Sequence, residues 1–205
     1  MTGVQRKKSN RALTGEVRII AGTWRSRRIQ FPSVEGLRPT PDRVRETLFN
    51  WLGHDLEGFR CLDLYAGSGA LGFEALSRGA GPVVMVERDG VAYRALEGNA
   101  KLLGATDLEL IRGDALEFAQ RLAGSAESGL AGTLSAKRFD LVFLDPPFGA
   151  GVPDELLLLL RSLLAPGARI YIESDRPVEL PEPWVIEKSG RAGQVHFQLL
   201  RLETA

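Results

Sequence analysis

The alternation of short apolar runs with longer amphipathic segments, which begins near residue 60, is the feature that most constrains the fold of this chain. Short apolar runs are typical of strands buried on both faces, and longer amphipathic segments are typical of helices. We predict strands at 60–65, 82–87, 107–111, 139–145 and 168–173, and helices near 70–78, 90–103, 115–122 and 153–164. A closing hairpin is expected at 184–188 and 194–202. The pattern predicts an α/β protein with a doubly wound, mostly parallel sheet and an antiparallel last strand.

The segment before this repeat predicts a small N-terminal β-hairpin extension followed by a helix. Residues 16–21 and 27–31 have period-two character and are joined by a short turn. Thr40 is placed to cap the helix, Pro41 suits its first position, and Gly53 is expected to end it. The expected organisation is a basic, disordered tail at 1–14, the RNA-binding hairpin extension at 15–36 and the main domain at 37–205.

The net charge of zero conceals a strong gradient along the chain. Residues 1–45 contain eleven Lys or Arg and three acidic residues, so this segment carries +8 and the remainder carries −8. A basic arm on an acidic body is typical of proteins that bind a polyanion, and cations beside an aromatic ring suit RNA. The residues predicted to contact RNA are Arg18, Trp24, Arg25, Arg27, Arg28 and Arg43. For residues 1–14, a merely solvated tail is the alternative.

Composition excludes several classes of protein. No stretch approaches the roughly 20 apolar residues that cross a bilayer, and the basic, polar start lacks the apolar segment of a secretory signal. We therefore expect a cytoplasmic protein that does not engage a membrane. A single cysteine, Cys61, excludes an internal disulfide, and together with His54 and His196 it gives no spacing for a metal site. Residues 123–137, rich in Gly, Ser and Ala, predict a flexible insertion without chemistry of its own.

A Gly-rich turn is predicted between the first strand of the sheet and the helix after it. Gly67 and Gly69 allow a ligand to approach the backbone, and the start of the helix offers free N–H groups. This glycine spacing alone fits a dinucleotide site equally well. Asp63 favours S-adenosylmethionine, because its carboxylate attracts the cationic amino-acid part of that molecule and repels a pyrophosphate. Glu87 can accept both hydroxyls of a ribose, and Asp114 is placed to accept a hydrogen bond from an adenine amine.

The tetrapeptide Asp145-Pro146-Pro147-Phe148 directly follows the fourth predicted strand. Two prolines end the strand, so the carboxylate lies at the sheet edge where ligands bind in open α/β folds. A carboxylate, rigid carbonyl groups and an aromatic ring can together hold the amine of a planar base. A simple strand-ending turn with Phe148 in the core is the alternative. An acid stands at the end of each of four successive predicted strands, and this arrangement favours a ligand site over a simple turn. The four acids are Asp63, Glu87, Asp114 and Asp145.

These motifs are similar to those of the bacterial 16S ribosomal RNA guanine-N2 methyltransferases. The resemblance covers essentially the whole chain after the tail, through VRIIAG, LRPTPDRVRETLFNWL, LDLYAGSGALGFEALSRGA, VERD, GDAL and FLDPPF. It implies a class I methyltransferase, Rossmann-like fold, S-adenosylmethionine as methyl donor, and one guanine of 16S rRNA in the 30S subunit or its assembly precursor as target. The cofactor residues expected on this basis are Arg38, Thr40, Asp63, Tyr65, Ala66, Gly67, Ser68, Gly69, Glu87, Arg88, Gly113, Asp114 and Ala115, and the catalytic ones are Asp145, Pro146, Pro147 and Phe148.

Three other functions remain open at the level of sequence. A methyltransferase acting on DNA adenine or protein glutamine uses a similar Pro-Pro-aromatic loop, although Asp at position 145 favours guanine. A nicotinamide-dependent oxidoreductase would explain the glycines but neither Asp63 nor the Asp145 loop. A non-catalytic RNA-binding assembly factor could retain the same fold. We expect a monomer.

Overall fold

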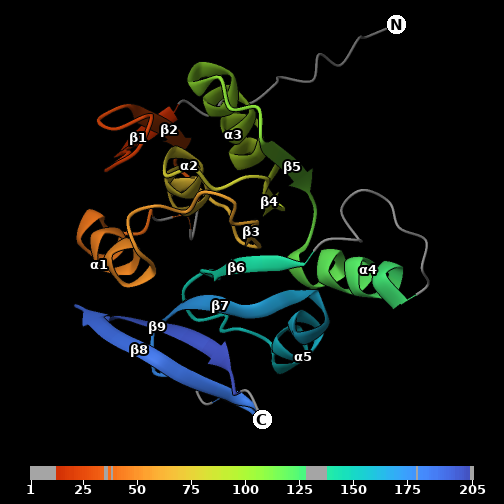
Figure 1. Cartoon of the computed structure of the whole chain (residues 1–205). Helices are drawn as coiled ribbons and strands as arrows, with labels where there is room; N and C mark the ends of the chain where they lie inside the picture. Colours follow the sequence, from red (N-terminus) through yellow and green to blue (C-terminus); the bar gives the residue numbers. More distant parts are fainter. Residues whose placement is uncertain (1–12, 35–36, 38, 128–137, 179, 204–205) are drawn as a thin grey trace, which may run out of the picture.

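A computed structural model describes residues 13–34, 37, 39–127, 138–178 and 180–203. Its main sheet has seven strands in the order β5-β4-β3-β6-β7-β9-β8 (Figure 1). These strands are β3 (Cys61–Asp63), β4 (Val83–Glu87), β5 (Leu108–Arg112), β6 (Phe139–Leu144), β7 (Leu164–Ser174), β8 (Trp184–Ala192) and β9 (Val195–Leu202). The pairs among β3 to β7 are parallel, whereas β9 runs antiparallel to both β7 and β8. The predicted fold class is confirmed.

Helices cover both faces of this sheet (Figure 1). They are α1 (Asp42–Leu52), α2 (Ala70–Ser77), α3 (Gly90–Leu103), α4 (Ala115–Glu127) and α5 (Asp154–Leu163). One apolar cluster joins the sheet to α1, α2 and α3, and a second joins the opposite face to α4 and α5. Successive residues of β6, such as Val142 and Phe143, therefore enter different clusters and are both fully buried. This is why the central strands have continuous apolar sequences.

The N-terminal extension is an antiparallel pair of strands, β1 (Leu13–Arg18) and β2 (Arg28–Pro32). Two successive backbone amides after β1 donate to the carboxylate of Glu74 in α2, at 2.8 and 3.0 Å. The same buried carboxylate pairs with Arg45 and Arg78. Asn99 of α3 both donates to and accepts from the backbone of Gln30 in β2. The hairpin is therefore fastened to α2 and α3 and shares their core, instead of projecting as a separate arm.

Some predicted boundaries were wrong. Helix α4 continues to Glu127, so residues 123–127 of the predicted flexible insertion are helical, and the rest of that segment, 128–137, lies outside the described residues. Helix α1 begins after Pro41 without a side-chain cap, because the Thr40 hydroxyl bonds to Asp145 instead. Gly53 does end α1 as expected. None of the helices in the described ranges is long and apolar enough to cross a bilayer.

Candidate active site

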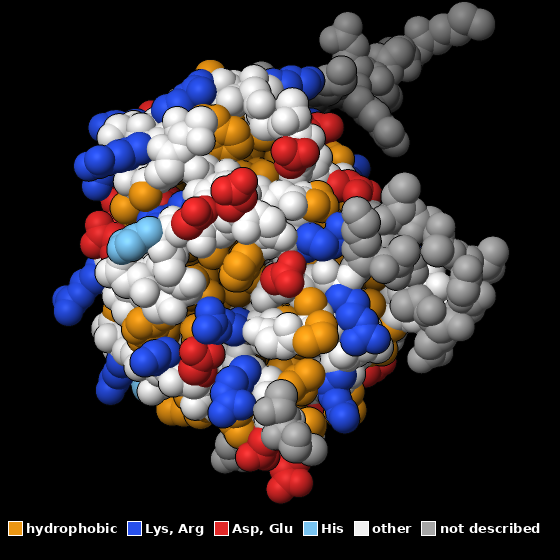
Figure 2. Space-filling view, in the orientation of Figure 1, with side chains coloured by type: hydrophobic (Ala, Val, Ile, Leu, Met, Phe, Trp, Pro, Cys, Tyr) orange, Lys and Arg blue, Asp and Glu red, His pale blue; other side chains and the backbone are white. Residues whose placement is uncertain are grey.

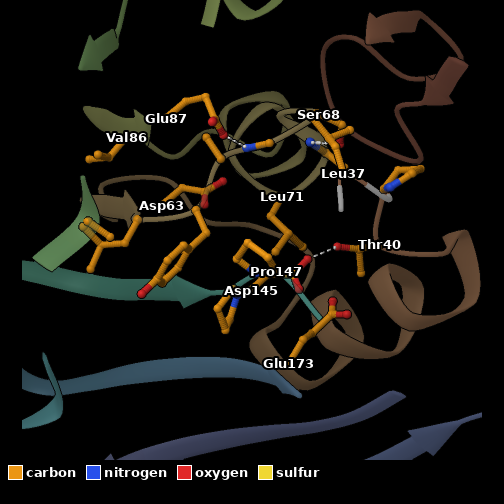
Figure 3. Close-up of a pocket in the computed structure, with 18 of the residues that line it drawn as sticks. Leu37, Thr40, Asp63, Ser68, Leu71, Val86, Glu87, Asp145, Pro147 and Glu173 are labelled. Carbon is orange, nitrogen blue, oxygen red and sulfur yellow. Dashed lines mark hydrogen bonds between the residues drawn. The ribbon is translucent and has the colours of Figure 1, made fainter. Parts of the chain in front are cut away.

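A pocket of about 450 Å³ opens at the carboxyl ends of β3, β4, β6 and β7 (Figure 3). Parallel strands end together at this edge, so side chains far apart in the sequence meet there. The residues that were expected from sequence and that line the pocket are Thr40, Asp63, Tyr65, Ala66, Gly67, Ser68, Glu87, Arg88, Gly113, Asp114, Ala115, Asp145, Pro146, Pro147 and Phe148. Gly69 is not among the lining residues, and Arg38 lies outside the described part of the chain.

The Gly-rich turn forms one wall of the pocket. Gly67 lines the pocket with φ +51, a backbone conformation that favours glycine, and a Cβ placed there would be in van der Waals contact with the carbonyl oxygen of Tyr65 at 3.7 Å. Gly69, with φ +81, precedes α2, and a Cβ there would lie 2.6 Å from the ring of Phe73. Gly67 therefore allows the turn its positive φ at the pocket wall, whereas Gly69 allows close packing of the turn against α2 and α3.

Asp63 is the most deeply buried acid of the pocket. Within the described part of the chain, its Oδ1 atom has no hydrogen-bond partner. Burial, followed by the nearby carboxylate of Asp145, raises the pKa of Asp63 to about 8. Backbone hydrogen bonds from Tyr65 and Gly72 oppose this rise, but a buried carboxylate oxygen without a partner is unfavourable unless a donor or a positive charge arrives from outside. Asp63 is thus suited to a cationic ligand.

Glu87 and Asp114 are held by backbone amides. The Glu87 carboxylate accepts from the amides of Gly67 and Asp89 at 2.8 and 2.7 Å, which ties the end of β4 to the Gly-rich turn. Burial raises the pKa of Glu87, and these two amides oppose the shift. Asp114 caps α4 by accepting from the amide of Leu116 at 2.9 Å. These bonds fix two carboxylates in the lining of the pocket.

The loop after β6 forms the other side of the pocket. The Asp145 carboxylate accepts a 3.1 Å hydrogen bond from the hydroxyl of Thr40 (Figure 3). Burial raises the pKa of Asp145 to about 6, and the Thr40 bond limits the rise. Pro146 is buried, whereas the ring of Phe148 is 59% exposed. The alternative that places Phe148 in the core is wrong, and its ring is free to stack on a ligand.

Several residues of this site were not predicted from the sequence. Glu173, at the end of β7, lies beside Asp145 in the pocket, and it could have been found by applying the strand-end rule to a fifth strand. Val34, Leu37 and Pro39 come from the segment that joins the hairpin to α1 and also line the pocket. No local pattern marks this segment, because only the docking of the hairpin brings it there.

The residues predicted to contact RNA do not all lie on the same element. Cationic side chains cluster over β1 and β2 in Figure 2. Arg25 is exposed, Arg27 donates to the carbonyl of Leu102 in α3, and Arg28 forms an exposed ion pair with Glu16. Arg18 lies 3.7 Å from Asp42, and Arg43 is exposed on α1. The ring of Trp24 is half-buried against the core, so it offers RNA only part of its surface.

The pocket fits the cofactor expected from the sequence. Asp63 supplies a buried oxygen without a partner among the described residues, which suits a positive charge, and Gly67 lines the pocket without a side chain. Glu87 and Asp114 supply acceptors along one wall, which suits the hydroxyl and amino groups of a nucleoside. A pyrophosphate would face several carboxylates, so the lining disfavours a dinucleotide.

The fold and the pocket together define a class I methyltransferase. The solved structure of the Escherichia coli methyltransferase yhhF superposes with a TM-score of 0.76 and 38% sequence identity, covering 93% of this chain and 100% of that one. A family model described as Conserved hypothetical protein 95 matches residues 17–201, and the chain belongs to this family.

Two relatives carry the same descriptive name, Ribosomal RNA small subunit methyltransferase D. The protein from Haemophilus influenzae is 41% identical, covering 90% of this chain and 93% of its own length. The protein from Escherichia coli K12 is 40% identical, covering 96% of both chains. The family resemblance drawn from the motifs is confirmed, and methyl transfer is favoured over the nicotinamide-dependent alternative.

Proposed function

We propose that this protein transfers a methyl group from S-adenosylmethionine to the exocyclic N2 amine of one guanine in 16S ribosomal RNA, within the small subunit or its assembly precursor. The observation that carries the proposal is one continuous pocket, which joins Asp63 and the Gly67 turn to the loop from Asp145 to Phe148. A cofactor and a base can therefore lie side by side in it. The names of the relatives support ribosomal RNA as the substrate class.

The cofactor half of the pocket is the part built from β3, β4 and β5. S-adenosylmethionine, when bound, supplies a methyl group attached to a positively charged sulfur. Asp63 attracts the positive charge of the ligand, and Glu87 accepts hydrogen bonds from the ribose hydroxyls. Asp114, held as the cap of α4, accepts from the adenine amine. Gly113 and Ala115 line the same wall and border the ring.

The base half is built by the loop after β6. The N2 amine of guanine is a weak nucleophile, because its lone pair is delocalised into the ring. Asp145 and the carbonyl group of Pro146 accept its two N–H bonds and draw the lone pair out of the ring plane. Phe148 stacks on the base from the rim of the pocket. Holding two reactants in this orientation accounts for about 7–11 kcal/mol of barrier lowering.

Proton removal requires no strong base. The nitrogen becomes acidic only after it has gained the methyl group, so a modest acceptor is sufficient. Asp145, whose pKa is raised to about 6, lies at the amine and can take this proton before passing it to water. The edge of a paired guanine is blocked, so the target must be unpaired or flipped out of its helix.

RNA docking is assigned to the hairpin extension at residues 15–36, which precedes the methyltransferase domain at 37–205. Arg25 and Arg27 lie in the turn between β1 and β2, Arg28 begins β2, and all three provide positive charge for phosphates. The linker after β2 contributes Leu37 to the pocket wall, so the hairpin is joined along the chain to a segment of the pocket. The protein acts as a monomer in this proposal.

Mass-spectrometric mapping of methylated nucleosides in ribosomal RNA tests the proposal. RNA from cells with and without the gene is compared, and cells lacking it should lose N2-methylation at one guanine of 16S rRNA. The wild-type gene should restore the mark, whereas Asp145→Ala should not. An unchanged guanine pattern, or loss of methylation from DNA adenine or protein glutamine instead, contradicts the proposal.

A further inference from the structure

Glu173 is a buried acid to which the reaction described above gives no role. It is only 5% exposed, yet its carboxyl group lines the pocket beside Asp145 (Figure 3). The hydroxyl of Tyr171, two residues earlier on β7, donates to its Oε1 atom at 2.8 Å. A carboxyl group in such a place raises the free energy of the folded chain, because it loses the solvation that water provides. Packing alone therefore gives no reason for an acid here.

The position of Glu173 follows from the register of two neighbouring parallel strands. Leu144 of β6 pairs with Ile172 of β7, so the next residues along, Asp145 and Glu173, lie side by side at the edge of the sheet. Adjacent strands are about 4.8 Å apart. Two carboxyl groups therefore face the base half of the pocket together, with Glu173 on the side away from Asp63 and the cofactor walls.

This arrangement matches one edge of guanine. The N2 amine and the N1–H group are neighbouring donors on that edge, followed by the O6 acceptor. Resting on the proposed function, we propose that the Glu173 carboxyl group accepts the N1–H of the target guanine while Asp145 holds the N2 amine, so that Glu173 selects guanine over purines that lack this hydrogen. Adenine and its analogues present an acceptor at N1, so no hydrogen lies between that nitrogen and the acceptor oxygen of Glu173.

Neighbouring groups favour the same pairing. Burial, followed by the negative charge of Asp145, raises the pKa of Glu173 to about 8. The Tyr171 hydroxyl donates to Oε1 and so keeps this atom as the acceptor oxygen of a neutral carboxyl group. In the proposed pairing, Oε1 accepts from N1–H and the other oxygen donates its proton to O6, whereas 2,6-diaminopurine requires the reverse arrangement. The Tyr171 and Thr40 hydroxyls orient the two carboxyl groups, and each group retains further acceptor capacity.

The test uses a base analogue that keeps the 2-amine, which accepts the methyl group, and changes only the two positions that Glu173 is proposed to contact. Small-subunit RNA is ligated with either guanosine or 2,6-diaminopurine at the methylated position, and single-turnover methylation by the full-length protein is measured. The analogue carries the same 2-amine but has an acceptor at N1 and an amine in place of O6. The wild-type protein should methylate guanosine roughly 10- to 100-fold faster than the analogue.

Two substitutions separate recognition from folding. Glu173→Met keeps the length of the side chain without hydrogen bonds, and it should bring the guanosine-to-analogue rate ratio to within about threefold of one. Glu173→Gln presents a carbonyl and an amine in the pattern of the neutral acid, and it should retain most of the wild-type preference. Glu187→Gln, a control on β8 outside the pocket, should leave both rates unchanged.

The outcomes distinguish this inference from the proposed function. If the wild-type protein methylates no guanosine N2 in any of these RNAs, the proposed function fails. If the wild-type protein methylates guanosine N2, two results overturn base selection by Glu173. The first is that Glu173→Met keeps the wild-type ratio of guanosine to analogue rates. The second is that Glu173→Gln loses this ratio while it binds S-adenosylmethionine with unchanged affinity.

Discussion

Replacing Asp63 by Asn should stabilise the free protein at alkaline pH and weaken cofactor binding at the same time. The substitution keeps the shape of the side chain and removes its ability to ionise. In the free protein this carboxyl group is buried, and one of its oxygens lacks a partner within the described residues. Its ionisation is therefore opposed by desolvation, which raises its pKa from 3.8 to about 8.

The magnitude follows from the difference between the folded and unfolded pKa values. Because the folded value is raised, the stability associated with neutral Asp63 is fully present below about pH 4 and is lost as the pH rises toward 8. Each pH unit in this window corresponds to about 1.4 kcal/mol, so the upper limit of the loss is on the order of 5 kcal/mol. An asparagine at this position has no such dependence. The advantage of the variant should therefore grow with pH by more than about 2 kcal/mol.

The assay is urea unfolding of both proteins at pH 5 and pH 8.5, with Asp107→Asn as a matched control on an exposed aspartate. The control should show little change with pH relative to wild type. Calorimetric titration with S-adenosylmethionine at pH 8.5 should show at least a tenfold loss of affinity for Asp63→Asn. If the stability of the Asp63→Asn variant relative to wild type is the same at both pH values, the desolvation argument is refuted, and unchanged affinity refutes the assigned role.

Three further predictions concern the reaction and the RNA. Asp145→Ala should lower the single-turnover methylation rate at least a hundredfold while cofactor affinity stays within a few-fold, and an unchanged rate would refute its role. In the wild-type protein the same rate should rise with pH through a midpoint near 6, because the raised pKa of Asp145 keeps its carboxyl group protonated below that value. The Asp145→Asn variant should lack this midpoint. Identical pH profiles of the two proteins would contradict the role assigned to Asp145. Neutralising Arg25, Arg27 and Arg28 together should weaken RNA binding and lower the slope of log K against log salt by about 2, and an unchanged slope would remove these arginines from the interface.

Much of the site was predictable because the ends of buried strands can be recognised in the sequence as the ends of short apolar runs. Asp63, Glu87 and Asp145 each end an apolar run, and parallel strands place such ends at one edge. Thr40 was expected near the cofactor, but its hydrogen bond to Asp145 was not, since the two residues are 105 positions apart. Glu173 could have been found by the strand-end rule, but its place beside Asp145 follows only from the register of β6 and β7.

The hairpin was also predicted only in part from the sequence. Its strands were expected from period-two patterning, but its attachment was not, because Glu74 and Asn99 look like ordinary helix residues in the sequence. Only the fold turns their side chains toward the backbone of the extension, where they satisfy otherwise unpaired amides.

The sequence by itself determined the order of strands and helices, the class of fold and the chemical type of most pocket residues. These follow from hydrophobic periodicity and turn chemistry, which are local properties of the chain. The tertiary structure decided which acids share one cavity, how far burial raises their pKa values, and how the hairpin is fixed to α2 and α3. These depend on distances between remote residues and on exclusion of water, and neither exists until the chain has folded.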